Sequence, residues 1–376
     1  MKPIQMVDLK SQYHKIKDEV DAKVLEVIES SAFINGYAVK DFQADLEKYL
    51  NVRNVIPCGN GTDALQVAMM ALGLKPGDEV ITAPFTFIAT AEVVALLGLK
   101  PVFVDVEEGS FNIDVTKIEA AITPRTKAIV PVHLFGQCCD MEPVLEIAKK
   151  HNIFVIEDAC QAIGSEYTFS DGTVKKAGTM GTIGCTSFFP SKNLGCYGDG
   201  GAVFTQDDEL AHTIRGIVNH GMFTRYYHDM IGVNSRSDSI QAAILDIKLK
   251  HLDEYNEARR KAADYYDKAF AGMENVEIPQ RATYSKHIFH QYTLKIKNVD
   301  RQKVIDEMKE VGVPVMIYYP VPLHLQKAFA AAGGKRGDFP VAEKLCDEVI
   351  SLPIHTELDD EQLLHITENL KRVIKG

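Results

Sequence analysis

Short apolar runs alternate with helical patterns from residue 54 onward, and this alternation constrains the fold more than any other feature of the chain. Runs rich in β-branched residues occupy 54–58, 79–85, 101–106, 127–136 and 153–159. Helical patterns lie between them at 63–74, 89–99 and 143–152. The strand-like runs are apolar almost throughout, which is typical of strands whose two faces are both covered by crossover helices. The alternation therefore predicts an α/β fold with a mostly parallel sheet.

The remainder of the chain predicts further strands of this sheet and a smaller second domain. The sheet is extended by strand-like runs at 184–189 and 201–206. One long helix is then expected from Asp238 to Phe270, and beyond it the pattern becomes α+β, with one strand-like run and two helical patterns at 290–297, 300–313 and 363–375. Because 376 residues exceed the roughly 250–300 at which a single core tends to split, we expect a large domain over 1–250 and a smaller one over 251–376.

Composition excludes several classes of protein. The 52 acidic residues outnumber the 41 basic ones, for a formal net charge of −11, so a nucleic-acid-binding surface is not expected. No apolar run reaches the roughly 18 residues of a membrane span, and the first residues lack a signal-like apolar segment. The seven cysteines include no C-x-x-C pair, so we expect reduced thiols, no metal site and a cytoplasmic location.

A glycine-containing turn follows the first predicted strand and opens a helix, with the sequence Gly59-Asn60-Gly61-Thr62-Asp63-Ala64. Glycines let the backbone approach a ligand closely, and the free N–H groups of a helix N-terminus favour a phosphate. The turn is also similar to a dinucleotide-binding fingerprint, with Glu79 as the ribose partner, which would make the chain a nucleotide-dependent oxidoreductase. Against this alternative, Glu79 precedes its strand instead of ending it. A tight turn without a ligand is the structural alternative.

An acidic residue ends the fifth strand-like run, in the sequence Val155-Ile156-Glu157-Asp158-Ala159-Cys160-Gln161. Ligands of α/β proteins bind at the carboxyl ends of parallel strands. A carboxylate at this place, here Asp158, can pair with a cationic ring nitrogen. The structural alternative for Asp158 is a helix N-cap.

One lysine, Lys192, lies between a predicted strand and a glycine-rich loop. It belongs to Ser187-Phe188-Phe189-Pro190-Ser191-Lys192-Asn193-Leu194-Gly195, which Gly198-Asp199-Gly200-Gly201 soon follows. A lysine in a partly apolar pocket near another cation has a lowered pKa and can form a Schiff base. A solvent-exposed loop lysine is the structural alternative.

Taken in order, the phosphate-type turn, E-D-A-x-Q and S-F-x-x-x-K-N with G-x-G-G resemble the DegT-type sugar-nucleotide aminotransferases. The resemblance extends from Asn35-Gly36 to the Tyr-Tyr-Pro segment near residue 320. It implies the fold of aspartate aminotransferase (fold type I) with a seven-stranded type of sheet, pyridoxal 5′-phosphate as the cofactor, and a homodimer with shared active sites. Relatives that dehydrate their substrate carry histidine at the lysine position, so Lys192 favours transamination.

The resemblance also implies a role for each matching residue. Lys192 corresponds to the lysine that carries the cofactor and then moves a proton, and Asp158 to the carboxylate that keeps the pyridine nitrogen protonated. Gln161 corresponds to a side chain near the phenolic oxygen. Phe87 corresponds to the aromatic ring stacked on the cofactor, with ordinary core as its structural alternative. The phosphate donors correspond to Gly61, Thr62, Ser187 and, from the neighbouring subunit, Asn234.

The sequence Gly232-Val233-Asn234-Ser235-Arg236, followed by Ile240-Gln241-Ala242-Ala243, is most similar to relatives that aminate a UDP-linked 3-keto-2-acetamido uronic acid. Glutamate is the implied amino donor, released as 2-oxoglutarate, and cell-surface glycan synthesis such as that of lipopolysaccharide O-antigen is the implied use. Arg236 would grip the uronate, with the donor carboxylate or a structural ion pair as alternatives. Tyr318 and Tyr319 correspond to a substrate-binding segment that is His-Tyr in many relatives.

Three alternatives to this function remain open at the level of the sequence. The acceptor could be a neutral 3-keto or 4-keto sugar on UDP or dTDP. The chain could be the oxidoreductase that the glycine-containing turn suggests, or a non-catalytic protein that binds sugar nucleotides.

Overall fold

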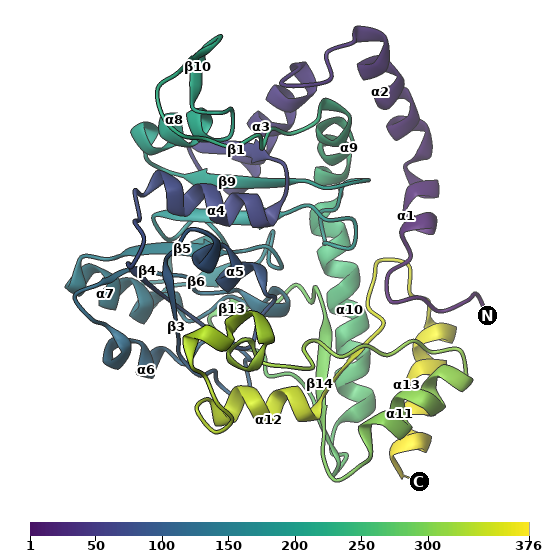
Figure 1. The fold of residues 1–376 in the computed structure, drawn as a ribbon. Helices are drawn as coiled ribbons and strands as arrows, with labels where there is room; N and C mark the ends of the chain where they lie inside the picture. Colours follow the sequence, from purple (N-terminus) through teal and green to yellow (C-terminus); the bar gives the residue numbers. More distant parts are fainter. Residues whose placement is uncertain (376) are drawn as a thin grey trace.

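A seven-stranded sheet forms the centre of the computed structural model, which describes residues 1–375 (Figure 1). The strands, in spatial order, are β1 (Asn54–Cys58), β9 (Gly201–Thr205), β8 (Ile183–Ser187), β5 (Phe154–Asp158), β4 (Thr126–Ile129), β2 (Glu79–Thr82) and β3 (Lys100–Phe103). β9 runs antiparallel to both of its neighbours, and the other neighbouring pairs are parallel. The predicted α/β fold with a mostly parallel seven-stranded sheet is therefore confirmed.

Helices cover both faces of this sheet, which explains why its strands are apolar at consecutive positions. In β5, Val155 belongs to a buried cluster with α7, whereas the next residue, Ile156, belongs to a cluster with α4, α5 and α8 on the opposite face. At the β1–β9 edge, α3 contributes Phe42, Leu46 and Leu50 to a further buried cluster. The helices are α3 (Tyr37–Leu50), α4 (Gly61–Ala71), α5 (Ala89–Leu96), α7 (Met141–His151) and α8 (Asp208–Ile217).

The first helices lie beside α9 (Ser239–Leu249), along one side of the molecule (Figure 1). They are α1 (Leu9–Lys15) and α2 (Lys17–Ser30). Ile16 and Val20 pack with Ile244 and Ile247 of α9. α1 and α2 therefore pack on the helix whose side chains contact Gly195 and Tyr197, in the loop that follows Lys192.

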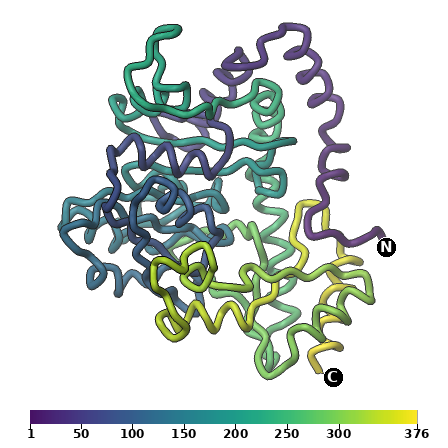
Figure 2. Tube along the Cα trace, in the orientation of Figure 1, coloured from purple at the N-terminus to yellow at the C-terminus, as the bar shows by residue number. Residues whose placement is uncertain are grey.

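A smaller antiparallel sheet occupies the C-terminal part of the chain. Its strands are β12 (Val276–Glu277), β14 (Tyr292–Ile296) and β15 (Val349–Leu352), and its helices are α10 (Leu252–Phe270), α11 (Arg301–Glu310) and α13 (Asp360–Lys375). Ile4 joins the buried cluster of these elements, so the start and the end of the chain lie on the same side of the molecule (Figure 2). The predicted strand at 290–297 and helix at 300–313 are confirmed to within a few residues.

The single long helix expected from Asp238 to Phe270 is wrong. The structure has two helices, α9 and α10, separated by Lys250 and His251. α9 is buried on most sides and packs against α2 and α3, whereas α10 buries one face and packs against α13. The break redirects the chain from one core to the other. It coincides with the expected domain boundary at 250. The division into 1–250 and 251–376 stays a prediction, and Leu345 of α12 (Pro340–Glu348) packs with the large sheet.

Several short elements lie outside the two sheets and were not anticipated, since segments of two to four residues carry little periodicity. β6, β7 and β13 form a three-stranded sheet, and β10 and β11 form a projecting hairpin (Figure 1). The bounds are α6 (Val115–Ile118), β6 (Glu166–Thr168), β7 (Val174–Lys176), β10 (Met222–Thr224), β11 (Tyr227–His228), β13 (Ser285–Lys286) and the longer α12 (Pro340–Glu348). Within residues 1–375, no helix has both the length and the apolar character needed to cross a lipid bilayer.

Candidate active site

Two strand ends and a helix N-terminus meet around a cavity of about 570 Å³. β5 and β8 end at Asp158 and Ser187, and α4 begins at Gly61, so the cavity lies where α/β proteins bind ligands. The cavity wall includes most of the predicted site residues, namely Gly61, Thr62, Phe87, Asp158, Gln161, Ser187, Lys192, Tyr318 and Tyr319.

The N-terminus of α4 supplies the part of the wall that attracts anions. Asn60 caps the helix, because its side-chain oxygen accepts the N–H of Asp63 at 2.8 Å. The first N–H groups of a helix have no intrahelical acceptor, so those of Gly61 and Thr62 are available to a ligand. Only glycine fits at position 61, since an added Cβ would lie 2.6 Å from the Cβ of Ser187. The close approach of α4 to β8 therefore depends on this glycine.

Asp158 ends β5 with only 5% of its surface exposed. Its Oδ2 accepts from the hydroxyl of Thr90 at 2.8 Å, and its Oδ1 accepts from the N–H of Cys160 at 3.1 Å. These two hydrogen bonds fix the orientation of the carboxylate. The segment after β5 forms turns and not a helix, so the helix N-cap alternative is wrong.

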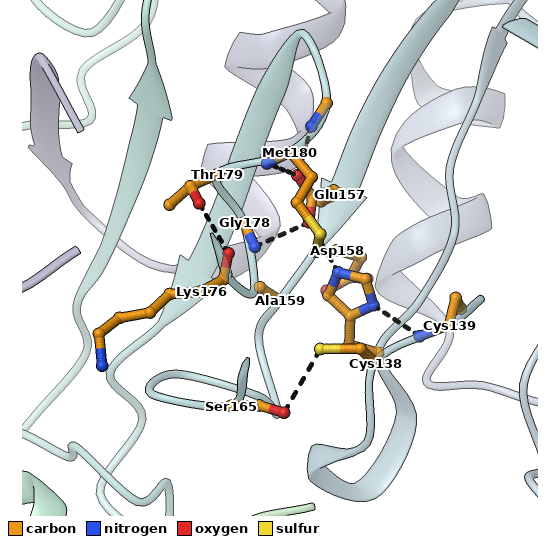
Figure 3. Close-up of polar contacts among 12 residues, drawn as sticks. Cys138, Cys139, Glu157, Asp158, Ala159, Ser165, Lys176, Gly178, Thr179 and Met180 are labelled. Carbon is orange, nitrogen blue, oxygen red and sulfur yellow. Dashed lines mark hydrogen bonds and ion pairs between the residues drawn. The ribbon is translucent and has the colours of Figure 1, made fainter. Parts of the chain in front are cut away.

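Next to Asp158, a second buried carboxylate, that of Glu157, stabilises the end of β5 (Figure 3). Glu157 accepts, at 2.8, 2.5 and 2.5 Å, from the N–H groups of Gly178, Met180 and Gly181. It also lies 2.8 Å from His133 Nε2. Because the N–H of Cys139 donates to His133 Nδ1 at 3.0 Å, the ring proton is on Nε2 and is donated to Glu157. Glu157 thus ties β5 to the two loops beside it.

Gln161 and Tyr319 form a hydrogen-bonded pair whose orientation is determined by the backbone. The N–H of Phe135 donates to Gln161 Oε1 at 2.9 Å, so Nε2 is the atom that donates to the Tyr319 hydroxyl at 3.0 Å. Since this hydroxyl accepts from Gln161, its own proton can be donated into the cavity. Burial raises the pKa of Tyr319 above its usual range, which keeps that proton in place.

Lys192 lies in a turn that is closed by two backbone hydrogen bonds. Its own N–H donates to the carbonyl of Phe189 at 2.8 Å, and the N–H of Cys196 donates to the carbonyl of Phe188 at 2.8 Å. Burial lowers the pKa of the Lys192 amine, which favours the neutral, nucleophilic form. Lys192 is half-buried in the cavity wall, so the solvent-exposed alternative is wrong.

Two side chains of α9 hold the loop that follows Lys192. Gln241 Oε1 accepts from the N–H of Tyr197 at 2.8 Å. Lys248 is buried, and its Nζ donates to the carbonyl of Gly195 at 2.5 Å and lies 5.2 Å from the centroid of the Tyr197 ring. Burial lowers the pKa of Lys248 to about 8. The turn that carries Lys192 is therefore anchored to a helix of the core.

Aromatic side chains form one side of the cavity. Phe87 is 55% exposed in the cavity wall, so the ordinary-core alternative for this residue is wrong. Its ring centroid lies 6.4 Å from that of Tyr319, and the Tyr318 and Tyr319 centroids are 6.0 Å apart. Burial raises the pKa of Tyr318. The stacking role of Phe87 and the substrate role of Tyr318 stay predictions.

Asn234 and Arg236 do not line this cavity. Asn234 is exposed, and Arg236 Nη1 donates to Asn219 Oδ1 at 3.2 Å. Between them, Ser235 is buried and donates to Asp63 Oδ2 at 2.7 Å, beside the N-terminus of α4. In this extended segment Ser235 therefore faces the chain's own site, while its two neighbours face away from it. Their roles in a neighbouring subunit stay predictions.

Glu79 is not a ribose partner. It begins β2, at the opposite end of the strand from the cavity, and it is 1% exposed. Its carboxylate accepts from Thr123, Arg125 and Lys100, at 2.5, 2.7 and 3.2 Å. Burial alone would raise the pKa of Glu79, but these three hydrogen bonds lower it to about 2. Glu79 is a structural residue, and the dinucleotide-binding alternative loses its acidic partner.

The wall residues to which the sequence assigned no role include Thr86, Thr90 and His290. Thr86 and Thr90 lie within three residues of Phe87, which the resemblance places on the cofactor, so their position in the chain was a usable signal. His290 only opens a strand-like run, and no motif surrounds it. Thr86 Oγ1 and His290 Nδ1 are both buried without a hydrogen-bond partner in the described part of the chain.

The residues of the cavity fit pyridoxal phosphate. Asp158 offers a carboxylate to the pyridine nitrogen, Lys192 offers an amine of lowered pKa to the aldehyde carbon, and Gly61 and Thr62 offer free N–H groups to the phosphate. The buried hydroxyl of Thr86, which has no partner among residues 1–375, is a further group available to a bound molecule.

Comparisons with known proteins agree with this chemistry. The family model described as "DegT/DnrJ/EryC1/StrS aminotransferase family" matches residues 14–371. The UDP-2-acetamido-2-deoxy-3-oxo-D-glucuronate aminotransferase of Pseudomonas aeruginosa is 46% identical over 95% of this chain and 96% of its own length. The UDP-N-acetyl-3-dehydro-alpha-D-glucosamine 3-aminotransferase of Acidithiobacillus ferrooxidans is 42% identical over 99% and 98%. A Geobacillus stearothermophilus protein described as a pleiotropic regulatory protein is 47% identical over 98% and 97%.

Solved structures share the fold over the whole chain. The crystal structure of S. venezuelae DesV in complex with a ketimine intermediate superposes with a TM-score of 0.95, at 36% identity, over 100% of both chains. NtdA from Bacillus subtilis, solved with bound cofactor PMP, superposes with a TM-score of 0.89 at 32% identity, over 99% of this chain and 83% of its own. The fold type that the resemblance implied is thereby confirmed.

Proposed function

The chain belongs to the DegT/DnrJ/EryC1/StrS aminotransferase family, and from this premise we propose that it transfers the amino group of glutamate to a UDP-linked 3-keto-2-acetamido uronic acid. It is a pyridoxal-phosphate-dependent sugar-nucleotide aminotransferase. When bound, pyridoxal phosphate supplies an electron sink that lets an amino group leave one carbon and reach another.

The observation that carries the proposal is the assembly of Lys192, Asp158 and the N-terminus of α4 in one cavity. Asp158, held by Thr90 and the N–H of Cys160, keeps a proton on the ring nitrogen. The Nζ of Lys192, whose pKa burial lowers, would take a proton from the amino-bearing carbon of the donor and deliver it to the carbon that receives the amino group. The free N–H groups of α4 hold the phosphate and thereby the position of the ring.

The uronic acid acceptor is supported by the 46% identity to the P. aeruginosa glucuronate aminotransferase and by Arg236. The planar guanidinium of arginine can bind a carboxylate with two parallel hydrogen bonds. Arg236 is half-buried, and the one hydrogen bond of its guanidinium within residues 1–375 is that of Nη1 to Asn219 Oδ1, so donors remain for a ligand. A neutral 3-keto sugar on UDP is the second candidate, because the A. ferrooxidans relative at 42% identity carries the name of such an enzyme.

We further propose a homodimer in which Asn234 and Arg236 reach the neighbour's cavity, since both face away from the cavity of their own chain. The test is to mix inactive Lys192→Ala and Asn234→Asp chains. Heterodimers would contain one intact site, so the mixture should regain part of the wild-type activity. An active protein that stays monomeric at assay dilution would contradict the shared site.

The proposal places the enzyme in the cytoplasm, in the synthesis of cell-surface glycans such as lipopolysaccharide O-antigen. The free thiols of all seven cysteines support a reducing compartment. A sugar-nucleotide acceptor supports a role before the sugar is transferred to a glycan.

The experiment that tests the function is the reverse reaction with 2-oxoglutarate and a panel of amino-sugar nucleotides. The panel contains a UDP-linked 3-amino uronic acid, its neutral 3-amino counterpart and a dTDP-linked 4-amino sugar, and glutamate formation is measured. The uronic acid should react with the highest kcat/KM, and Lys192→Ala should form no glutamate. Preference for a neutral sugar would contradict the acceptor but leave the aminotransferase intact.

A further inference from the structure

His290 occupies an unusual position in the cavity wall. It is 5% exposed, and its Nδ1 is buried without a hydrogen-bond partner among the described residues. An unsatisfied buried polar atom costs about 1–3 kcal/mol, so such atoms persist chiefly where they have a function. Of the side chains with buried, unpartnered atoms in residues 1–375, only His290 and Thr86 line this cavity. Of these two, His290 carries an imidazole, whose two ring nitrogens can donate one hydrogen bond and accept another.

The backbone holds His290 in place on both sides. Its N–H donates to the carbonyl of Phe135 at 2.8 Å, and its carbonyl accepts from Arg259 Nη1 at 3.2 Å. Contacts to two different elements therefore fix the backbone of His290, and with it the point in the wall from which the ring projects. A backbone fixed in this way lowers the ordering cost of binding a ligand.

A buried arginine, Arg259, adjoins His290. Arg259 is 2% exposed and donates only to carbonyl oxygens, those of Phe289, His290 and Ile354. Lys192 lies in the same cavity wall. Burial, followed by the charges of Lys192 and Arg259, lowers the pKa of His290 well below 6.5, so the imidazole is neutral at pH 7 and has one N–H to donate. The carboxylate of Asp158 accepts from Thr90 and the N–H of Cys160, and the proposed function assigns its remaining acceptor capacity to the cofactor nitrogen.

We propose that His290 is a substrate-binding residue that donates its ring N–H to a carboxylate of the amino donor. The inference rests on the proposed function, because it concerns the glutamate and 2-oxoglutarate that the reaction would exchange. Both molecules are dicarboxylates and must enter this cavity to reach Lys192. Arg259, which has no carboxylate partner among the described residues, favours an anionic ligand near His290, and a neutral imidazole supplies a directed hydrogen bond to it.

The test compares His290→Phe with a matched control, His287→Phe. His287 is also buried, but its Nδ1 accepts from the N–H of Phe289 at 3.0 Å, and it does not line the cavity. In both variants phenylalanine keeps an aromatic ring at the position but removes the ring nitrogens. The melting temperature of the cofactor-loaded protein is measured without and with glutarate, a dicarboxylate that has neither an amino nor a keto group and therefore cannot react.

The two variants should behave in opposite ways. His290→Phe removes an unsatisfied nitrogen, so its melting temperature without glutarate should equal or exceed that of the wild type. Its glutarate-induced shift should disappear, and its KM for glutamate should rise about tenfold, the effect of losing one charged hydrogen bond. His287→Phe leaves the N–H of Phe289 without an acceptor, so its melting temperature should fall while its glutarate shift remains.

A His290→Phe protein that melts several degrees lower and keeps the full glutarate shift would overturn the inference, because His290 would then be structural. If the wild type shows no glutarate shift, both the inference and glutamate as the donor fail. In that case the reverse assay with other keto acids would still detect a sugar aminotransferase, so the two failures are distinguishable.

Discussion

The hydroxyl of Thr90 lies 2.8 Å from Asp158 Oδ2 and donates to it. Thr90 belongs to α5, and Asp158 ends β5, so this bond joins two elements that are 68 residues apart in the chain. It orients the carboxylate that we assign to the cofactor nitrogen. The orientation of Asp158 therefore depends on a residue outside the E-D-A-x-Q motif.

Thr90→Val should lower kcat by about fivefold, the effect of losing about 1 kcal/mol from one hydrogen bond in the site. Valine has the same shape, so the fold should be retained. Thr90→Ser keeps the hydroxyl and serves as the control, with nearly wild-type kcat. Asp158→Asn should lower kcat by about 100-fold or more, since it removes the charge itself. Equal turnover of Thr90→Val and Thr90→Ser would show that the bond has no catalytic effect.

Arg236→Ala should lower kcat/KM for the UDP-linked uronic acid by about 10- to 100-fold, because a charged hydrogen bond to the carboxylate is lost. The half-reaction with glutamate should change little. Steady-state kinetics with the uronic acid and its neutral counterpart, together with single-turnover kinetics with glutamate, separate these effects. Equal losses on the acidic and neutral sugars would argue against a bond to the carboxylate.

Glu79→Gln should reduce the free energy of unfolding by roughly 2 kcal/mol at pH 7. This is less than the loss for a fully buried pair, because Lys100 and Arg125 are 58% and 63% exposed. The folded-state pKa of about 2 lies below the ordinary value of 4.5, so the stabilisation is fully present above about pH 4.5. It is lost as the pH falls toward 2. Urea unfolding of both proteins between pH 7 and pH 3 should therefore show a difference that shrinks on acidification.

The control for Glu79→Gln is Arg336→Gln, which breaks the pair of Arg336 with Asp347, in which both side chains are exposed. Exposed pairs contribute little, so this variant should unfold like the wild type. A Glu79→Gln difference that grows toward pH 3 would mean that the carboxylate is destabilised by the fold and not stabilised.

The sequence was sufficient for the large sheet because its strands are buried on both faces, so that Val155 and Ile156 are apolar in succession. The motifs likewise identified Lys192 and Asp158 as candidate site residues, since a strand end or a glycine-rich turn consists of residues that are adjacent in sequence. The break between α9 and α10 was not predictable, because Lys250 and His251 are tolerated within helices and only the two separate cores require a change of direction. The contacts of Thr90 and His290 were missed because they join distant segments of the chain.

Whether Lys192 carries the cofactor is tested by borohydride reduction of the purified enzyme followed by peptide mapping. Reduction would fix the cofactor irreversibly to the lysine that carries it. The added mass should be found on Lys192 alone, and Lys192→Ala should carry no label, although that variant should still fold. A cofactor fixed to another lysine, such as the buried Lys248, or an enzyme that carries no reducible cofactor, would contradict the active site described here.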